Sequence, residues 1–344
     1  MSTSSENVSI WATRDRILIG RGPTDRIDPG IGPNRYQRAL DELQASGREV
    51  ALASFTFDVE EPGSVIEIPT RVEAISPSFL SSSNGHVDGS IVSTGFDGWR
   101  AGLEGALATI SRNQAEKVVL TRQVDLQFDS EVDVRSVAAR LVAAEPDCFT
   151  FAVDGLVGAS PELLVSLRNG SVTSIALAGT AVDSGALSSD KMDREHSLSQ
   201  FSVEEGLIVH VEDLEVDDRT IFEFGEIKHL ATKFHGNAVP GTTVLDMLAS
   251  LHPTAAVAGM PRDAAIEAIR DLEPKSRGRY AGPVGWFDAS GEGEFAIALR
   301  CGLLKGDKAT LYAGGGIVEG SDAESEFAET ELKLAPMMRA LRID

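Results

Sequence analysis

The sequence predicts an α+β fold, in which a many-stranded, largely antiparallel sheet is interspersed with helices. Two dipeptides typical of tight hairpins, Asp154-Gly155 and Asn169-Gly170, separate successive apolar stretches, and a third turn at Ser290 to Gly293 separates two more. Hairpins join antiparallel neighbours, whereas parallel strands need long crossovers. These turns therefore argue against a purely parallel, doubly wound sheet, and we expect one domain over residues 1–344.

The first ninety residues predict few elements and show no recognisable chemistry. Residues 34–46 have a helical pattern, and Val50 to Phe57 and Ser64 to Pro69 alternate as strands do, with proline and glycine between them. The polar stretch Ser81 to Gly89 predicts a surface loop. We therefore divide the chain into a less recognisable portion, 1–90, and a core, 91–344.

The core begins with a predicted helix that ends before Lys117. Its apolar residues are spaced to share one face: Trp99, Leu103, Leu107 and Ile110. Extended segments are predicted at 117–126, 148–154, 156–167, 171–178, 222–234, 280–288, 294–304 and 309–318. Helices are predicted at 132–145, 190–213, 241–251, 261–271 and 323–343.

Composition restricts the possible partners. A formal net charge of -22 disfavours nucleic acid and anionic membranes. An anionic substrate would then need a bound cation or local Lys and Arg residues at its site. Cys148 and Cys301 lie far apart in apolar surroundings without CxxC spacing, which indicates reduced core residues. With no signal-like N-terminus and no run of about 18 apolar residues, we expect a cytoplasmic protein. We also expect it to act as a monomer.

From Lys117 onward the sequence resembles the chorismate-utilising enzymes, which include isochorismate synthases, salicylate synthases, anthranilate synthase large subunits and aminodeoxychorismate synthases. The order and spacing of ten blocks carry the resemblance: KVVLTR (117–122), GASPELL (158–164), LAGTA (177–181), SDKMDREH (189–196), KHLATKFHG (228–236), LHPTAAVAGMP (251–261), YAGPVGW (280–286), ALR (298–300), YAGGGIV (312–318) and EFAETELKL (326–334). The LHPTAAVAGMP and YAGPVGW blocks look most like the isochorismate synthase branch. The resemblance implies one large α/β domain whose antiparallel sheets enclose the active site.

The resemblance also implies an acid and a base. Isochorismate synthases move a hydroxyl group from C4 to C2 of chorismate, with Lys117 activating water and Glu162 protonating the leaving hydroxide. Burial or a nearby cation would help a lysine give up its proton, and a desolvated site would keep Glu162 protonated. From residue type alone, both would be read as exposed strand and turn residues.

Two glutamates, Glu195 and Glu329, match the positions that hold Mg²⁺ in the family, with Glu326 one helical turn before Glu329. Carboxylate oxygens suit a hard cation, which would bind the ring carboxylate of chorismate. The alternative is a pair of ordinary helix-surface ion pairs, because Lys191 to Glu195 and Glu329 to Lys333 both have i, i+4 spacing.

The remaining site residues are also implied by the resemblance. Arg300 and Lys333 would hold the enolpyruvyl carboxylate, for which a guanidinium fork is well shaped. Backbone amides would approach the substrate at two glycine-containing segments, represented by Gly179, Thr180, Gly314 and Gly316. His229 would be an active-site histidine, and Tyr280 would form part of the pocket wall. Tight turns explain glycines equally well, and a lone histidine in a strand is usually structural.

Two positions favour water over ammonia or lysine as the nucleophile. Ala178 stands where aminodeoxychorismate synthases carry a nucleophilic lysine, and Lys117 stands where anthranilate synthases carry a glutamine. No glutaminase subunit is then needed, and the product would enter menaquinone or siderophore synthesis. One departure, Met192-Asp193 before Arg194, alters the family pattern beside Glu195. Salicylate synthase and a non-catalytic chorismate-binding protein are the alternative functions.

Overall fold

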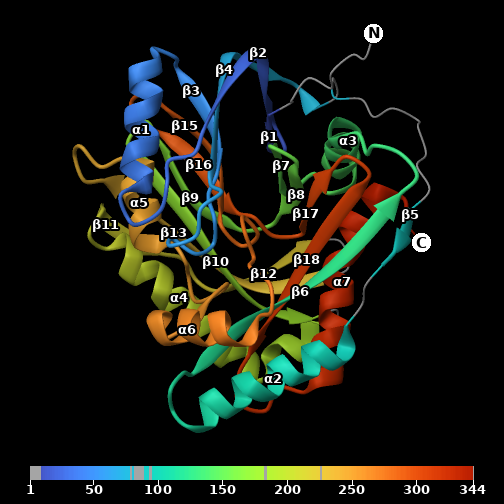
Figure 1. Ribbon diagram of the computed structural model, residues 1–344. Coiled ribbons are helices and arrows are strands. Elements are labelled where there is room, and N and C mark those ends of the chain that lie inside the picture. The colour runs from blue at the N-terminus through green and yellow to red at the C-terminus, as the bar shows by residue number, and fades with distance from the viewer. Residues whose placement is uncertain are drawn as a thin grey trace.

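The computed structural model describes residues 9–77, 80, 89–92, 95–181, 184–224 and 227–343, with the side chains of residues 180, 181, 184 and 186 left aside. Within these ranges every strand pairing is antiparallel, as the hairpin turns predict. The chain forms one domain in which two sheet arms are joined at one edge (Figure 1).

The first arm runs, in hydrogen-bonded order, through β6 (Lys117–Phe128), β18 (Lys308–Ile317), β17 (Cys301–Lys305), β8 (Leu156–Ser160), β7 (Phe149–Val153), β1 (Ile10–Ala12) and β2 (Ile17–Ile27). The second arm runs through β4 (Val65–Ile75), β3 (Val50–Ser54), β15 (Pro283–Asp288), β16 (Gly293–Ile297), β9 (Leu163–Arg168), β10 (Ser171–Ala181) and β13 (Ile227–Ala238). Pairing of β2 with β4 joins the arms. Short strands complete the edges: β5 (Gly89–Ile91) and β14 (Gly259–Met260) on β6, and β11 (Val211–Val216) and β12 (Thr220–Phe224) on β13.

The helices lie outside the sheets. They are α1 (Arg35–Ser46), α2 (Phe96–Ser111), α3 (Val134–Ala144), α4 (Asp190–Leu207), α5 (Val244–Leu251), α6 (Arg262–Leu272) and α7 (Ala323–Leu341), with a 3₁₀ turn η2 (Ser184–Ser188) before α4. In Figure 1, α1 and α5 lie on one side of the molecule, α3 and α7 on the other, and α2 crosses the lower end. Among the described residues, no helix is both long and apolar enough to span a bilayer.

The core has two parts because successive side chains of a strand point to opposite faces. In β1, Trp11 packs into a cluster between the sheet arms, while Ile10 and Ala12 pack into a second cluster beneath α3 and α7. In β6 the division runs along the strand instead, because Val118 and Leu120 belong to the first cluster, whereas Val124 and Leu126, farther along the same face, belong to the second. Lys117, at the start of β6, points to the face opposite Val118 and Leu120, the face that lines a cavity with Val119 and Thr121.

Capping residues fix the first turns of the two helices that bear the predicted metal ligands. The Ser189 side chain accepts a hydrogen bond from the Met192 backbone N–H at the start of α4, and Asp322 accepts one from Ser325 N–H at the start of α7. Side-chain caps of this kind satisfy otherwise unpaired amides and stabilise a helix by about 1 kcal/mol. They hold Lys191 and Glu326 in well-defined first turns.

Four of the predicted segments differ from the observed elements by an internal break or an early end. Residues 156–167 form two strands, separated at Pro161 and Glu162, and residues 294–304 form two, separated around Arg300. Residues 222–234 belong to two strands, and the helix predicted over 190–213 ends at Leu207. An apolar run has the same pattern whether or not the strand is interrupted, so periodicity missed these breaks. The strands β1, β2, β5, β11 and β14 were not predicted. Most of the predicted 81–89 loop lies outside the described residues, although Gly89 begins β5.

Candidate active site

One cavity between the sheet arms is lined by ten of the predicted site residues: Lys117, Glu162, Gly179, Glu195, His229, Tyr280, Arg300, Gly314, Gly316 and Lys333. Glu329 and Glu326 lie on α7 behind this lining, and Glu329 contacts Lys333 directly. Thr180 belongs to β10, and its side chain is outside the described part of the chain. Residues far apart in the sequence thus meet at one place.

The two strand interruptions face one another and supply Glu162 and Arg300. The Ile297 N–H donates to the Glu162 carbonyl at 3.1 Å, and the Ala159 N–H donates to the Arg300 carbonyl at 3.3 Å. Pro161 has no N–H for a sheet ladder, and Arg300 has a left-handed backbone with φ of 47°. That conformation costs roughly 1–3 kcal/mol for a non-glycine residue. The paired breaks therefore turn both side chains out of the sheet and into the cavity.

Lys117 is fully buried at the first position of β6. Its Nζ lies 3.1 Å from Oε1 of Glu195 and 3.5 Å from Oγ of Ser199, both on α4. Gly316 makes this pairing possible, because a Cβ atom there would lie 2.5 Å from Oε1 of Glu195 and 2.7 Å from Cε of Lys117. The role of this glycine is thus to make room for the ion pair.

Glu162 is also buried, with only 4% of its surface exposed. Burial raises the pKa of its carboxyl to about 8, although the Leu177 backbone N–H and the charges of Lys117 and Lys333 act in the opposite direction. A carboxyl with this pKa holds its proton at neutral pH. Glu162 can therefore donate a proton inside the cavity, as a general acid must.

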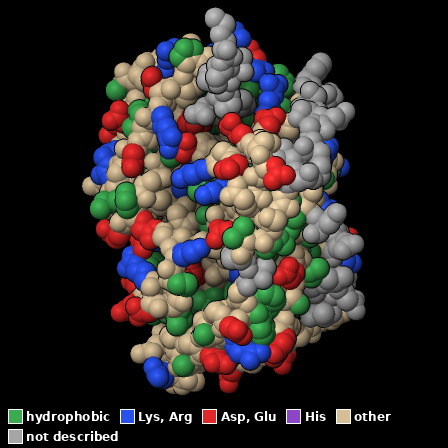
Figure 2. All heavy atoms as spheres, turned by 45° about the vertical axis from the view of Figure 1, so that its right-hand side comes forward, with side chains coloured by type: hydrophobic (Ala, Val, Ile, Leu, Met, Phe, Trp, Pro, Cys, Tyr) green, Lys and Arg blue, Asp and Glu red, His purple; other side chains and the backbone are tan. Residues whose placement is uncertain are grey.

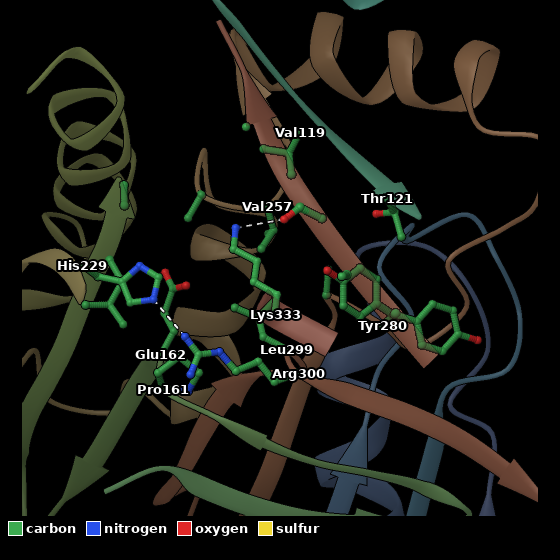
Figure 3. Close-up of a pocket in the computed structure, with 18 of the residues that line it drawn as sticks. Val119, Thr121, Pro161, Glu162, His229, Val257, Tyr280, Leu299, Arg300 and Lys333 are labelled. Carbon is green, nitrogen blue, oxygen red and sulfur yellow. Dashed lines mark hydrogen bonds between the residues drawn. The ribbon is translucent and has the colours of Figure 1, made fainter. Parts of the chain in front are cut away.

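His229 positions Arg300 (Figure 3). Its Nδ1–H donates to the Gly179 carbonyl at 3.1 Å, so that Nε2 accepts a hydrogen bond from Nη2 of Arg300 at 2.9 Å. Burial lowers the pKa of His229 well below its usual value, and the neighbouring Arg300 and Lys333 charges lower it further. His229 is therefore neutral, and the hydrogen bonds fix its tautomer.

Lys333 extends from α7 toward the middle of the pocket (Figure 3). Its Nζ donates to the Gly314 carbonyl at 2.9 Å and lies 2.6 Å from Oε1 of Glu329. Nearby, Tyr280 stacks on Tyr312 with ring centroids 5.0 Å apart. A Cβ atom at Gly314 would lie 3.1 Å from the Tyr280 hydroxyl and 2.8 Å from the Leu120 carbonyl. The glycine lets this wall approach the strand closely.

The cavity is basic although the protein is acidic. Its lining includes the cationic side chains of Lys117, Arg277, Arg300 and Lys333 but only two carboxyls, those of Glu162 and Glu195. Glu195, Glu329 and Glu273 pair with three of these four cations, and Glu162 holds its proton at neutral pH. The local charge is therefore only slightly positive. On the face shown in Figure 2, acidic and basic side chains are interspersed rather than gathered into one patch. The lining offers an anion the local cations that the overall charge of -22 requires.

Each of the three predicted metal ligands is paired with a different lysine: Glu195 with Lys117, Glu329 with Lys333 and Glu326 with Lys191. The i, i+4 pairing considered as an alternative thus forms in α7, whereas in α4 Lys191 reaches across to Glu326 at 2.6 Å. Burial is the largest single effect on Glu195 and would raise its pKa, but the charge and hydrogen bond of Lys117, together with the charges of Lys333 and Lys191, outweigh it and the pKa is lowered. For Glu326, burial and the charge of Glu329 leave the pKa raised.

The carboxylates suit a hard cation in chemistry, since they are oxygen donors already in contact with positive charge. In their present arrangement, the described part of the chain brings no three His, Cys, Asp or Glu side chains close enough to hold a metal ion. A metal would therefore have to replace lysine ammonium groups at these carboxylates.

Sequence reasoning missed Arg277, a buried residue of the cavity lining. Its guanidinium donates to the carbonyls of Val257 at 2.8 Å and Val119 at 2.6 Å, and it pairs with Glu273. It thereby ties the loop containing Val257 to β6 next to Lys117. The only signal in the sequence was its place three residues before Tyr280, at the edge of the YAGPVGW block.

The fold and this cavity define the class of protein: the chain belongs to the family of chorismate-binding enzymes, whose model "Chorismate binding enzyme" matches residues 73–342. This confirms the resemblance found in the sequence, and with it the predicted fold class.

Among individual relatives, the chain is 30% identical to "Isochorismate synthase DhbC" of Bacillus subtilis, over 97% of this chain and 93% of that protein. It is 35% identical to "Isochorismate synthase MenF" of the same organism, over 71% of this chain but only 55% of that protein. The structure of MenF, "the Menaquinone-Specific Isochorismate Synthase from Escherichia Coli", is similar with a TM-score of 0.80 and 26% identity, over 99% of this chain and 89% of that chain.

Proposed function

We propose that this protein is a magnesium-dependent isochorismate synthase, which isomerises chorismate to isochorismate reversibly. One observation carries the proposal: buried Lys117 and buried Glu162 line the same basic cavity, and a pKa of about 8 keeps Glu162 protonated. The names of the relatives DhbC and MenF support the same activity. A protein that only binds chorismate has no use for both an acid and a base.

The reaction needs one proton accepted and one donated. Water attacks C2 of chorismate and gives a proton to Lys117, the ring double bonds shift, and the C4 hydroxyl leaves as water with the proton of Glu162. The reverse reaction exchanges the two roles. Nζ of Lys117 is engaged by Oε1 of Glu195 at 3.1 Å, so this contact has to open before the lysine can accept a proton from water.

Arg300 and Lys333 hold the enolpyruvyl carboxylate in this proposal. His229 fixes the plane of the Arg300 guanidinium through a 2.9 Å hydrogen bond, which prepares it for bidentate contact with a carboxylate. Lys333 is held by the Gly314 carbonyl and by Glu329. Since both cations are positioned by the protein, little side-chain entropy is lost when the anion binds.

Glu195 and Glu329, with Glu326 beside them, are the residues that would hold Mg²⁺. The bound cation would neutralise the ring carboxylate and polarise it. Two substrate carboxylates next to three glutamates would otherwise repel one another strongly. The identity of residues 178 and 117 favours water as nucleophile, so we propose no glutaminase partner.

The test is to mix the purified protein with chorismate and Mg²⁺ and separate the products by chromatography over time. We expect isochorismate in a reversible mixture with chorismate, little salicylate near neutral pH, and no turnover in excess EDTA. Ala256 and Val257 are small or medium lining residues, and we expect that they do not fold the enolpyruvyl side chain over the ring, as pyruvate elimination requires.

Two results would overturn parts of this proposal. Salicylate and pyruvate formed at the rate of chorismate loss would make the protein a salicylate synthase. Turnover that persists in EDTA and is unchanged by added Mg²⁺ would show that Glu195 and Glu329 do not hold a metal.

A further inference from the structure

Of the three Lys–Glu pairs near the cavity, the Lys191–Glu326 pair is set apart. Lys117 and Lys333 line the cavity and have roles in the proposed reaction, whereas Lys191 does not line it. Lys191 lies in the first turn of α4 and Glu326 in the first turn of α7, with 2.6 Å between Nζ and Oε1. The pair thus joins the two helices that carry the predicted metal ligands.

We propose that Lys191 is a tethered cation, which neutralises Glu326 in the metal-free protein and competes with the divalent cation for that carboxylate. This inference rests on the proposed function, because it assumes that a metal binds at these glutamates. It assigns to Lys191 the control of metal affinity, without contact with substrate.

The surroundings of Glu326 explain why a counter-cation is needed. The Glu326 side chain is 4% exposed, and its Oε1 accepts hydrogen bonds from Nζ of Lys191 and, at 2.8 Å, from Oγ of Ser321. A buried carboxylate without a compensating charge is costly. Lys191 also lies within electrostatic reach of Glu195 and Glu329. Its ammonium is therefore placed in the field of all three carboxylates, where a metal would be favoured.

Lys191 is also the lysine most easily displaced. Its side chain is 31% exposed, compared with 1% for Lys117 and 20% for Lys333. A lysine has a long flexible stem and a strongly hydrated head, so this ammonium can move into water at low cost.

The departure from the family pattern leaves this pairing intact. A Cβ atom at Gly179 would lie 3.1 Å from Sδ of Met192, so Met192 packs against β10, and Asp193 pairs with Arg219 at 2.7 Å. Neither residue pairs with Lys191, whose ion-pair partner is Glu326. Lys191 therefore retains its position between the acidic side chains.

The test is isothermal titration of the full-length protein with Mg²⁺ alone. Lys191→Gln removes the competitor and its repulsion, and should lower the Kd for Mg²⁺ by about tenfold, as expected for one unit charge several ångströms from a divalent ion. Lys191→Met, which keeps most of the stem, should do the same. Lys191→Arg keeps the charge and should bind Mg²⁺ no more tightly than the wild type. Lys275→Gln is the matched control, because it removes the same charge from an exposed pair with Asp125 and should leave Kd unchanged.

Tighter binding is the opposite of what structural damage at α4 would produce. An unchanged or weaker affinity in both charge-removing variants, with Glu329→Gln abolishing binding to the wild type, would overturn the role of Lys191 and leave the metal site standing. Absence of Mg²⁺ binding in the wild type and in both charge-removing variants would overturn the proposed metal as well.

Discussion

Lys117→Ala should lower turnover of chorismate by about a thousandfold or more, while the protein stays folded and still binds chorismate. The expected loss is that of removing a general base for which the cavity offers no substitute. The other cationic lining residues have different tasks: Arg300 is held by His229, Lys333 by Gly314 and Glu329, and Arg277 by backbone carbonyls and Glu273. Turnover is measured by chromatography and binding by calorimetry.

Lys117→Arg separates proton transfer from charge. Arginine keeps a cation beside Glu195 but does not lose its proton in proteins, so this variant should be as inactive as the alanine variant. A near wild-type rate in Lys117→Ala, or substantial activity in Lys117→Arg, would show that the proton passes through another residue.

Glu162→Gln should also lower turnover by about a thousandfold, because glutamine has nearly the same shape but cannot donate a proton to the leaving hydroxide. Chorismate binding should survive, since the cations that hold the substrate remain. A variant that keeps most of its activity would show that another group protonates the leaving hydroxide.

The same substitution should change how stability depends on pH. The native pKa of Glu162 is about 8, raised from 4.5 by burial, so between these values the native state holds a proton that the unfolded state has lost. The contribution of Glu162 to the free energy of unfolding is largest below the unfolded pKa. It falls as pH rises toward 8, by up to about 1.4 kcal/mol per pH unit. Glutamine removes this dependence. The variant should therefore gain stability relative to the wild type as pH rises from about 5 to about 8.

Denaturant unfolding of both proteins across that pH range measures the difference, in which the contributions of all other groups cancel. Parallel curves would mean that Glu162 is ionised in the native state at neutral pH, which would exclude it as the general acid.

Local sequence signals predicted much of the fold. The Asp154-Gly155 and Asn169-Gly170 turns require only adjacent residues, and both join antiparallel neighbours as expected. The helices α1 and α7 follow from apolar spacing over several turns. The breaks at Glu162 and Arg300 could not be predicted this way, because each is fixed by the strand opposite it, far away in the sequence.

The active site, like the fold, could be predicted only in part from the sequence. Family blocks identified the residues that line the cavity, but spacing alone could not decide between surface ion pairs and a metal site. Glu195 pairs with Lys117 and Lys191 with Glu326. Both contacts depend on where α4, which packs on β10, lies relative to β6 and α7. The neutral state of His229 and the raised pKa of Glu162 likewise arise from burial, which no single segment of sequence specifies.

The central claim is that water, activated by Lys117, supplies the new hydroxyl group. Turnover of chorismate in water labelled with oxygen-18, stopped early and examined by mass spectrometry, tests it most directly. The proposed mechanism predicts one labelled oxygen in each newly formed isochorismate, at the C2 hydroxyl. Isochorismate that carries no label would mean that the hydroxyl group moves from C4 within the molecule, which would contradict the roles of both Lys117 and Glu162.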